Sequence, residues 1–344
     1  MEQNQEVPQL QEFMGKTIVI TGASSGIGRA TALAFAKKKA NVVLVARREN
    51  ALKDLAGECE QLGGKALIVP ADVTDENAMK NVAHRAIETY GKIDVWVNDA
   101  AVTLFGRFEE TPSEAFRRVM ETNFFGYVNG ARAVMPHFRE KGRGTLINVS
   151  SVAGEVAQPY TSAYTASKSA INAFAESLRM ETTDLPEVHV STVLAASIDT
   201  PLFQHGANYT GRAVKPMAPV YKAEEVASRI VSLAEHPKRE VVVGGAGRLL
   251  LAMQAFMSPL VERMMAKKVE TGHFQERPAP ISEGNLFKPV DQWTGISGGW
   301  RNGIQNHVAA KRVAFGLGIL TVGLGVFGLA HMRNSRRRRV LGLF

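Results

Sequence analysis

The chain has 344 residues, of which 45% are hydrophobic, so it suits one large globular domain with an extension and excludes a disordered chain. Its single cysteine, Cys59, excludes a framework of internal disulfides and suits a reducing compartment. The formal net charge is +8, and five arginines fall between Arg333 and Arg339, so most of the excess charge lies at the C-terminal end.

Residues 1–14 form a polar N-terminal tail in the predicted organisation. This tail has no basic stretch followed by an apolar one, so the sequence predicts no secretory signal. We therefore expect the globular part of the chain, residues 15–248, to face the cytoplasm.

Short apolar runs alternate with longer amphipathic runs from residue 15 to residue 248. The apolar runs are rich in Val and Ile, as strands buried on both faces of a parallel sheet are. The predicted strands are Thr17–Thr21, Asn41–Ala46, Ala66–Val69, Asp94–Asn98, Thr145–Val149, Val188–Leu194 and Glu240–Val243. The predicted helices include Gly28–Lys39, Glu76–Tyr90, Ser113–Lys141 and Ala163–Asp184. The alternation predicts an α/β fold, a doubly wound Rossmann-type parallel sheet of about seven strands with helices on both faces.

A glycine-rich segment, TGASSGIG, follows the first strand and opens the first helix. Gly22, Gly26 and Gly28 let the backbone turn sharply and approach a pyrophosphate closely. The helix N-terminus then offers free N–H groups and a partial positive charge to that anion. A tight strand-to-helix turn without a ligand is the structural alternative.

The second strand ends at Ala46, where a carboxylate would favour NAD by accepting hydrogen bonds from the adenosine ribose. Here the next residues are Arg47 and Arg48. Arginine pairs with a 2′-phosphate, so this end predicts NADP(H), with Ser24 adding a hydroxyl. A solvated strand end is the alternative. Asp72 and Val73 follow the third strand and are placed to meet the adenine.

Ser151, Tyr164 and Lys168 are the predicted catalytic residues. Tyr164 and Lys168 are four residues apart on a predicted helix and share one face. The ordinary pKa of tyrosine, near 10, is too high for efficient acid–base work at neutral pH, and a neighbouring ammonium is expected to lower it. Ser151, at a strand end, is placed to hydrogen-bond a substrate oxygen.

Together with ADV, NDAA, TNFFG, INVSS and TPL, the segments TGASSGIG and YTASK resemble the short-chain dehydrogenase/reductase family across roughly residues 15–245. The resemblance implies a Ser-Tyr-Lys site and a nicotinamide cofactor. It also implies that Asn123, in TNFFG, holds a water in a proton relay to the lysine. The expected cofactor-binding residues are Gly22, Ser24, Ser25, Gly26, Ile27, Gly28, Arg47, Asp72, Val73, Asn98, Tyr164, Lys168, Ile198 and Thr200.

Two segments depart from the family's pattern. Where the family has NNAG, this chain keeps Asn98 but carries Asp99 and Ala101. Where the family has Pro-Gly after the sixth strand, it carries Ala195-Ala196. Both changes are expected to affect cofactor affinity more than the type of reaction.

The chain changes character after about residue 245. Residues 249–312 are predicted to be a variable substrate-binding and linker region, which begins with a methionine-rich helix, Arg248–Lys268, and continues without clear periodicity over 271–303. Val313–Ala330 is uncharged, the lower limit for a membrane span. We expect residues 313–331 to span or enter a membrane, or else to pack on protein, and residues 332–344 to form a basic tail that contacts lipid.

These features predict an NADP(H)-dependent oxidoreductase acting on an alcohol or carbonyl group, with a lipophilic small molecule as substrate. A membrane-tethered NADP-binding scaffold with little catalysis is the alternative, motivated by the two departures. The histidines lack ligand spacing, so we expect no catalytic metal. We also expect a homo-oligomer and no nucleic acid partner, although salt-sensitive nucleic acid binding by the arginine tail stays open as a minor reading.

Overall fold

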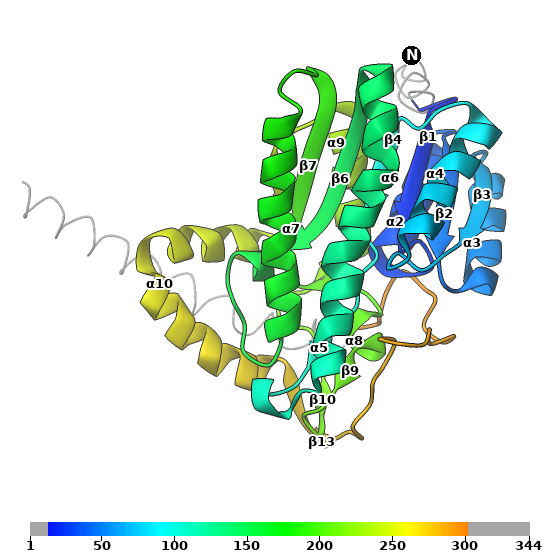
Figure 1. Cartoon of the computed structure of the whole chain (residues 1–344). Coiled ribbons are helices and arrows are strands. Elements are labelled where there is room, and N and C mark those ends of the chain that lie inside the picture. The colour runs from blue at the N-terminus through cyan, green and yellow to red at the C-terminus, as the bar shows by residue number, and fades with distance from the viewer. Residues whose placement is uncertain (1–12, 302–344) are drawn as a thin grey trace, which may run out of the picture. The chain divides into compact units, whose positions relative to one another are not determined.

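The computed structural model describes residues 13–301, which form a seven-stranded parallel sheet with helices on both faces (Figure 1). The strand order is β12-β7-β6-β4-β1-β2-β3, and every neighbouring pair is parallel. The predicted doubly wound fold is therefore confirmed. The sheet strands are β1 (Thr17–Thr21), β2 (Asn41–Ala46), β3 (Lys65–Pro70), β4 (Val95–Asn98), β6 (Arg143–Ser151), β7 (Glu187–Ala195) and β12 (Glu240–Val243).

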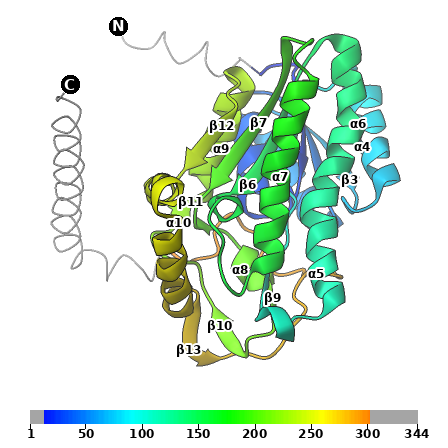
Figure 2. The same ribbon diagram turned by 60° about the vertical axis from the view of Figure 1, so that its left-hand side comes forward.

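Helices cover each face of the sheet and bury their apolar sides against it (Figure 2). On one face, α2, α3 and α9 pack on the sheet, with Phe35, Leu55 and Ile230 fully buried. On the other face, α4, α6 and α7 supply Met79, Phe138 and further buried side chains. The bounds are α2 (Gly26–Lys37), α3 (Glu49–Gln61), α4 (Glu76–Tyr90), α6 (Gly126–Lys141), α7 (Ser162–Glu181) and α9 (Ala223–Glu235).

The prediction of one continuous helix over Ser113–Lys141 is wrong in one respect, because the helix is interrupted. It consists of α5 (Ser113–Met120), a π-helical turn (Glu121–Phe125) and α6. A π-turn inserts extra chain into a helix and often marks a functional site, and here it contains Asn123. Amphipathic periodicity is preserved on both sides of the insertion, which is why the pattern predicted one helix.

The smaller elements lie mainly beyond the carboxyl edge of the sheet. They are β5 (Leu104–Phe105), β8 (Ile198–Asp199), α8 (Leu202–His205), β9 (Ala207–Asn208), β10 (Arg212–Val214) and β11 (Tyr221–Lys222). The predicted methionine-rich helix is α10 (Gly245–Gly272), which is bent at Met257. It leads into β13 (Phe274–Pro278), which pairs antiparallel with β10, so part of the stretch predicted to be a loop is a strand.

Two of the predicted domain boundaries can be compared with the described residues. Phe13, assigned above to the polar tail, is fully buried and stacks edge-on against Phe35 with ring centres 5.0 Å apart. Residues 249–300 pack in the same compact unit as the sheet. No helix between residues 13 and 301 is long and apolar enough to cross a membrane. The predicted segments 313–331 and 332–344 lie outside the described residues and stay predictions.

Candidate active site

Three predicted side chains meet at the carboxyl edge of the sheet. Ser151 ends β6, while Tyr164 and Lys168 project from the first two turns of α7. The side chains of Ser151 and Tyr164 are hydrogen-bonded to each other. The Lys168 Nζ atom lies 5.6 Å from the centre of the Tyr164 ring. The structure therefore places a phenol between a hydroxyl and an amine.

The Lys168 amine is held in place by the Val149 carbonyl and the Tyr127 hydroxyl, which the sequence analysis did not predict. Its Nζ donates to the Val149 carbonyl oxygen at 2.9 Å and lies 3.4 Å from the Tyr127 hydroxyl. The Tyr127 hydroxyl donates to the same carbonyl at 2.8 Å. Tyr127 is buried four residues after Asn123, on the same side of the helix, and that spacing is the signal that could have found it. The carbonyl and the phenol fix the amine beneath the Tyr164 ring.

Burial governs how Tyr164 titrates. Desolvation raises the pKa of Tyr164 to about 12, the hydrogen bond with Ser151 opposes the rise, and the charge of Asp99 adds to it. The lowered pKa of Tyr164 expected from the neighbouring lysine is therefore wrong, because removal of the phenol from water is the largest cause of its shift. Burial also lowers the pKa of Lys168 to about 8, against the attraction of Asp99. At neutral pH Tyr164 carries its proton and can act as an acid.

Ser151 is fixed by its neighbours on the sheet edge. Its hydroxyl donates to the Ala195 carbonyl oxygen at 3.2 Å and accepts from the Ala153 N–H at 3.1 Å. These contacts, from the end of β7 and from the turn after β6, fix the position of the Ser151 oxygen next to Tyr164.

Asn123 has almost no free capacity on its side chain. Its amide group donates to the Val102 carbonyl oxygen at 2.9 Å and to the Ser167 hydroxyl at 3.0 Å, and its oxygen accepts from the Val102 N–H at 2.8 Å. This side chain therefore ties the π-turn to α7, one residue before Lys168. A water relay at this residue would have to use its main chain.

The glycine-rich loop forms a tight cradle at the N-terminus of α2. Gly22 has φ +72°, and a Cβ on Gly28 would lie 2.5 Å from the Gly22 carbonyl oxygen. Ser25, the N-cap residue, makes no side-chain capping bond. The Ile27 N–H donates to no group of the described residues, as expected where a helix end is left for an anion. The loop thus fits a dinucleotide pyrophosphate.

Replacing Gly22 with Ala is expected to damage this cradle. The new Cβ would lie 2.8 Å from the Ala100 main chain, at a φ that L-residues rarely adopt. We expect the free energy of unfolding to fall by about 1–3 kcal/mol and cofactor affinity to fall with it. Gly57→Ala in α3 is the matched control, because nothing lies within 4 Å of its Cβ. Urea unfolding and cofactor titration measure both effects, and equal behaviour of the two variants would contradict the prediction.

Two arginines follow β2 and make different contacts. The Arg48 guanidinium donates to the Ser24 hydroxyl at 2.9 Å and to the Ser25 hydroxyl at 2.8 Å. Arg47, the predicted 2′-phosphate ligand, instead donates to the Asn285 carbonyl oxygen at 2.6 Å and lies 4.0 Å from Asp72. Arg48 is therefore the arginine that reaches the loop.

The predicted adenine-side residues are tied into the protein. Asp72 pairs with Arg118 at 2.6 Å, a partner that the sequence did not reveal. The Val73 carbonyl oxygen accepts from the Asn129 side chain at 2.9 Å. The fully buried Asn98 side chain bonds to Trp96, Tyr127 and Asn148, so only its main chain is left for a cofactor.

Residues 284–300 form an irregular segment, called the C-terminal arm below, that runs along the cofactor loop. The Gly295 carbonyl oxygen accepts from the Gly26 N–H at 3.0 Å, and those of Val290 and Gln292 accept from Arg48. Near the predicted residues Ile198 and Thr200, Asp199 accepts hydrogen bonds from the arm. Its donors are the Ser297 hydroxyl and the N–H groups of Gly298 and Trp300. Sequence reasoning missed these contacts because the arm has no periodicity.

Comparison with known proteins shows the family to which this chain is similar. The model of the family described as short chain dehydrogenase matches residues 16–208. An uncharacterized oxidoreductase of Bacillus subtilis, YxnA, is 38% identical over 283 residues, which are 81% of this chain and 80% of that protein.

The chain belongs to the short-chain dehydrogenase family. It is accordingly an oxidoreductase of that family. A 3-ketodihydrosphingosine reductase of Bos taurus is 33% identical over 266 residues, covering 75% of this chain and 80% of the relative. A solved short-chain dehydrogenase/reductase from Burkholderia phymatum in complex with NAD has a TM-score of 0.66 and 24% identity, covering 72% of this chain and 96% of that structure.

Asp99, where this chain departs from the family's pattern, is a buried carboxylate beside the site. Its carboxylate accepts a hydrogen bond from the Gly28 N–H, and it interacts electrostatically with Lys168. Burial raises the pKa of Asp99 to about 7, against the pull of the lysine. Its charge raises the pKa of both Lys168 and Tyr164.

Asp99→Asn is therefore expected to move the alkaline loss of reductase activity to lower pH, by about half a unit to one unit. Removing the carboxylate lowers the pKa of Lys168 and of Tyr164, so both lose their protons earlier as pH rises. The measurement is the dependence of kcat/KM on pH between 6 and 10. Asp94→Asn, at the opposite end of the same sheet, is the matched control. A profile that moves up or stays in place would contradict the prediction.

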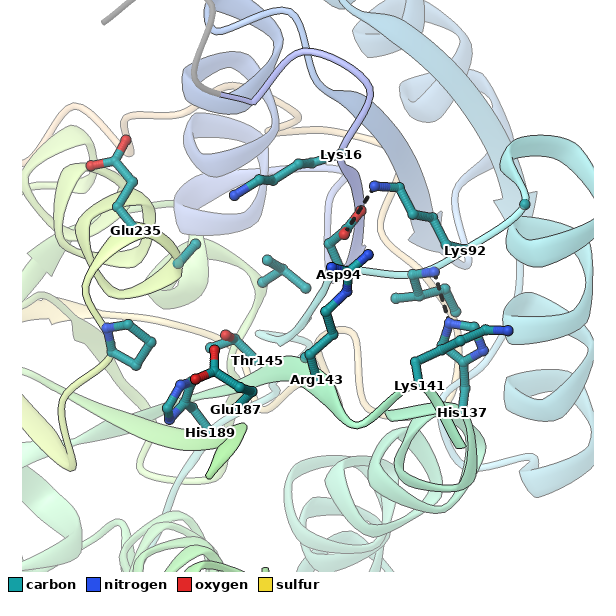
Figure 3. A pocket seen from close by; sticks show the side chains of 16 residues that line it. Lys16, Lys92, Asp94, His137, Lys141, Arg143, Thr145, Glu187, His189 and Glu235 are labelled. Carbon is teal, nitrogen blue, oxygen red and sulfur yellow. Dashed lines mark hydrogen bonds and ion pairs between the residues drawn. The ribbon is translucent and has the colours of Figure 1, made fainter. Parts of the chain in front are cut away.

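A charged hollow lies at the amino edge of the sheet, far from Ser151 (Figure 3). Its lining includes Lys16, Asp94, His137 and Arg143, with Lys92 paired to Asp94 at 3.1 Å. Ligands of open α/β sheets bind at the carboxyl edge, so this hollow is not the candidate active site. Within residues 13–301, no group of acidic, histidine or cysteine side chains is arranged to hold a metal ion.

Proposed function

We propose that this chain transfers a hydride between NADP(H) and the carbonyl or alcohol carbon of a lipophilic small molecule, with Tyr164 as the general acid/base. The observation that carries the proposal is the meeting of Ser151, Tyr164 and Lys168 at the carboxyl edge of the sheet, beside the glycine-rich loop. A pure binding protein would have no need of a buried amine beneath a buried phenol.

A nicotinamide, when bound, supplies or accepts the hydride. Tyr164 donates its proton to the carbonyl oxygen during reduction, and its high pKa keeps that proton available. The Lys168 ammonium stabilises the phenolate left behind, because it is held beneath the ring by Val149 and Tyr127. Ser151 donates to the same substrate oxygen once its hydroxyl hydrogen turns away from the Ala195 carbonyl oxygen, while the Ala153 N–H keeps the Ser151 oxygen in place.

The preference for NADP(H) rests on the group formed by Arg48, Ser24 and Ser25. Arg48 donates to both serine oxygens, so each hydroxyl hydrogen is left to donate to another acceptor. Two hydroxyls and a guanidinium at one point suit a phosphate monoester better than a ribose hydroxyl. The predicted role of Arg47 stays a prediction, since its donors are directed at the C-terminal arm.

The lipophilic class of substrate rests on the apolar surroundings of the site. Val152 follows Ser151 directly, Val156 lies five residues after Ser151, and both pack with Phe105 and Leu194. Val261, Met265 and Val269 of α10 complete this apolar cluster. The bovine relative is named 3-ketodihydrosphingosine reductase, a name that supports a ketone as the substrate. We also propose that the compact unit containing the sheet works in the cytoplasm. The formation of a homo-oligomer stays a prediction.

The test is a screen of NADPH oxidation by the full chain against long-chain and cyclic ketones, with NADH run in parallel. We expect turnover with at least one lipophilic ketone and slower turnover with NADH. NADPH binding with neither reduction of any ketone nor oxidation of any matching alcohol would favour the scaffold alternative. Equal rates with NADH would reject the cofactor preference and leave the reaction type standing.

A further inference from the structure

Of the eleven exposed large apolar side chains between residues 13 and 301, four lie on one bent helix, α10. Phe256, at 87% exposure, is the most exposed large apolar residue between residues 13 and 301. Leu249, Met257 and Leu260 of the same helix are 48%, 41% and 55% exposed. We call Phe256, Met257 and Leu260 the α10 apex.

The bend in α10 explains why the apex points outward. Met257 has φ −140° and ψ 42°, outside the helical region, and Pro259 cannot donate to the turn before it. On the far side of the bend Val261, Met265 and Val269 are buried against the body of the protein. Figures 1 and 2 both show the bend lying away from the sheet. The inner face of α10 is thus buried by packing, whereas the apex is exposed.

Cations flank the apex on both arms of the helix. Arg248 lies before it, and Arg263, Lys267 and Lys268 follow it. None of the four forms an ion pair with the described residues. Of the two acidic residues of α10, Glu270 is occupied by Arg212 and Tyr160, which leaves Glu262 as the only opposing charge. The exposed side of α10 is therefore apolar in the middle and basic at both ends.

We propose that α10 docks on an anionic lipid bilayer, with Phe256, Met257 and Leu260 inserted at the boundary between headgroups and acyl chains. A helix with an apolar strip and basic flanks lies in this interface because burial of the strip and attraction to anionic lipid act together. A protein partner would have to supply acidic groups on both sides of an apolar socket, whereas an anionic bilayer presents them at every point. The inner face of α10 packs on the apolar cluster beside Ser151, so docking would set the site next to the bilayer.

The test reads the environment of α10 itself, because other parts of the full chain, including residues 313–344, could also bind lipid. Ala255→Cys places one thiol beside the apex without removing an apolar side chain, and it is exposed. Cys59, the only native thiol, is buried and its pKa is raised to about 12, so a polarity-sensitive dye such as NBD labels position 255 alone. Asp54→Cys on α3, exposed at the other edge of the sheet, is the matched control.

We expect the emission at position 255 to shift to the blue with phosphatidylcholine vesicles containing phosphatidylserine, and the emission at position 54 to stay unchanged. Adding Phe256→Ser and Leu260→Ser is expected to weaken partition about tenfold or more, because two large apolar side chains no longer enter the lipid. Phe108→Ser, at another exposed site outside α10, should leave the partition unchanged. Arg263→Gln and Lys267→Gln should each weaken it about fivefold, less so at high salt.

Other results would overturn the proposal. Vesicle binding with no change at position 255 would mean that another segment holds the lipid. A blue shift without vesicles that grows with protein concentration would mean that a second copy covers the apex. A blue shift without vesicles at every concentration would mean that the chain's own segment covers it. These readouts need no substrate, so they can fail independently of the proposed reaction.

Discussion

Tyr164→Phe is expected to lower kcat for ketone reduction about 10³-fold or more while the Kd for NADPH stays within about twofold. The variant keeps the ring but removes the hydroxyl that Ser151 contacts and that carries the proton. The phenol of Tyr127 is not available to replace it, because the Tyr127 hydroxyl donates to the Val149 carbonyl oxygen and accepts from Lys168. The measurements are steady-state NADPH oxidation and cofactor titration by fluorescence.

Tyr90→Phe is the matched control for this prediction, since Tyr90 ends α4 away from the site. It should leave both constants unchanged. If Tyr164→Phe keeps normal turnover, Tyr164 is not the proton donor and the proposed mechanism is wrong. If it loses NADPH binding along with turnover, the phenol holds the cofactor and its catalytic role is unproven.

The sheet could be predicted closely because both of its faces are buried. A strand such as β2, NVVLVA, is apolar on both sides, and only a strand inside a parallel sheet needs that. The loop and the pair Tyr164 and Lys168 were also predictable, since each depends on spacing within a few residues. Local geometry of this kind can be predicted because it depends only on residues that are close together in the sequence.

What escaped prediction depends on long-range contacts. The π-turn around Asn123 leaves no mark in the amphipathic pattern, because helix continues on both sides of it. The pKa of Tyr164 rises although a lysine lies beneath it, since the depth of burial is set by the whole fold. The C-terminal arm meets Gly26 and Arg48 from more than 200 positions away, and it has neither periodicity nor a motif.

Arg48→Ala is expected to raise the Kd for NADPH about 10- to 150-fold and to leave the Kd for NADH within about threefold. A charge-assisted hydrogen bond contributes roughly 1.5–3 kcal/mol, which corresponds to a change of this size. The variant loses the guanidinium and also the contacts that hold Ser24 and Ser25 in place. Titration of both cofactors, with kcat/KM for each, measures the change in preference.

Arg47→Ala is the natural comparison, because it removes the same charge one residue earlier. Its guanidinium is engaged by the Asn285 and Leu286 carbonyl oxygens, so its loss should weaken NADPH binding by less than Arg48→Ala does. If Arg47→Ala has the larger effect, the arm must release that side chain when the 2′-phosphate binds, and Arg47 is the selecting residue. If both variants weaken NADPH and NADH alike, neither arginine reads the 2′-phosphate, and the preference for NADP(H) is lost from the proposal.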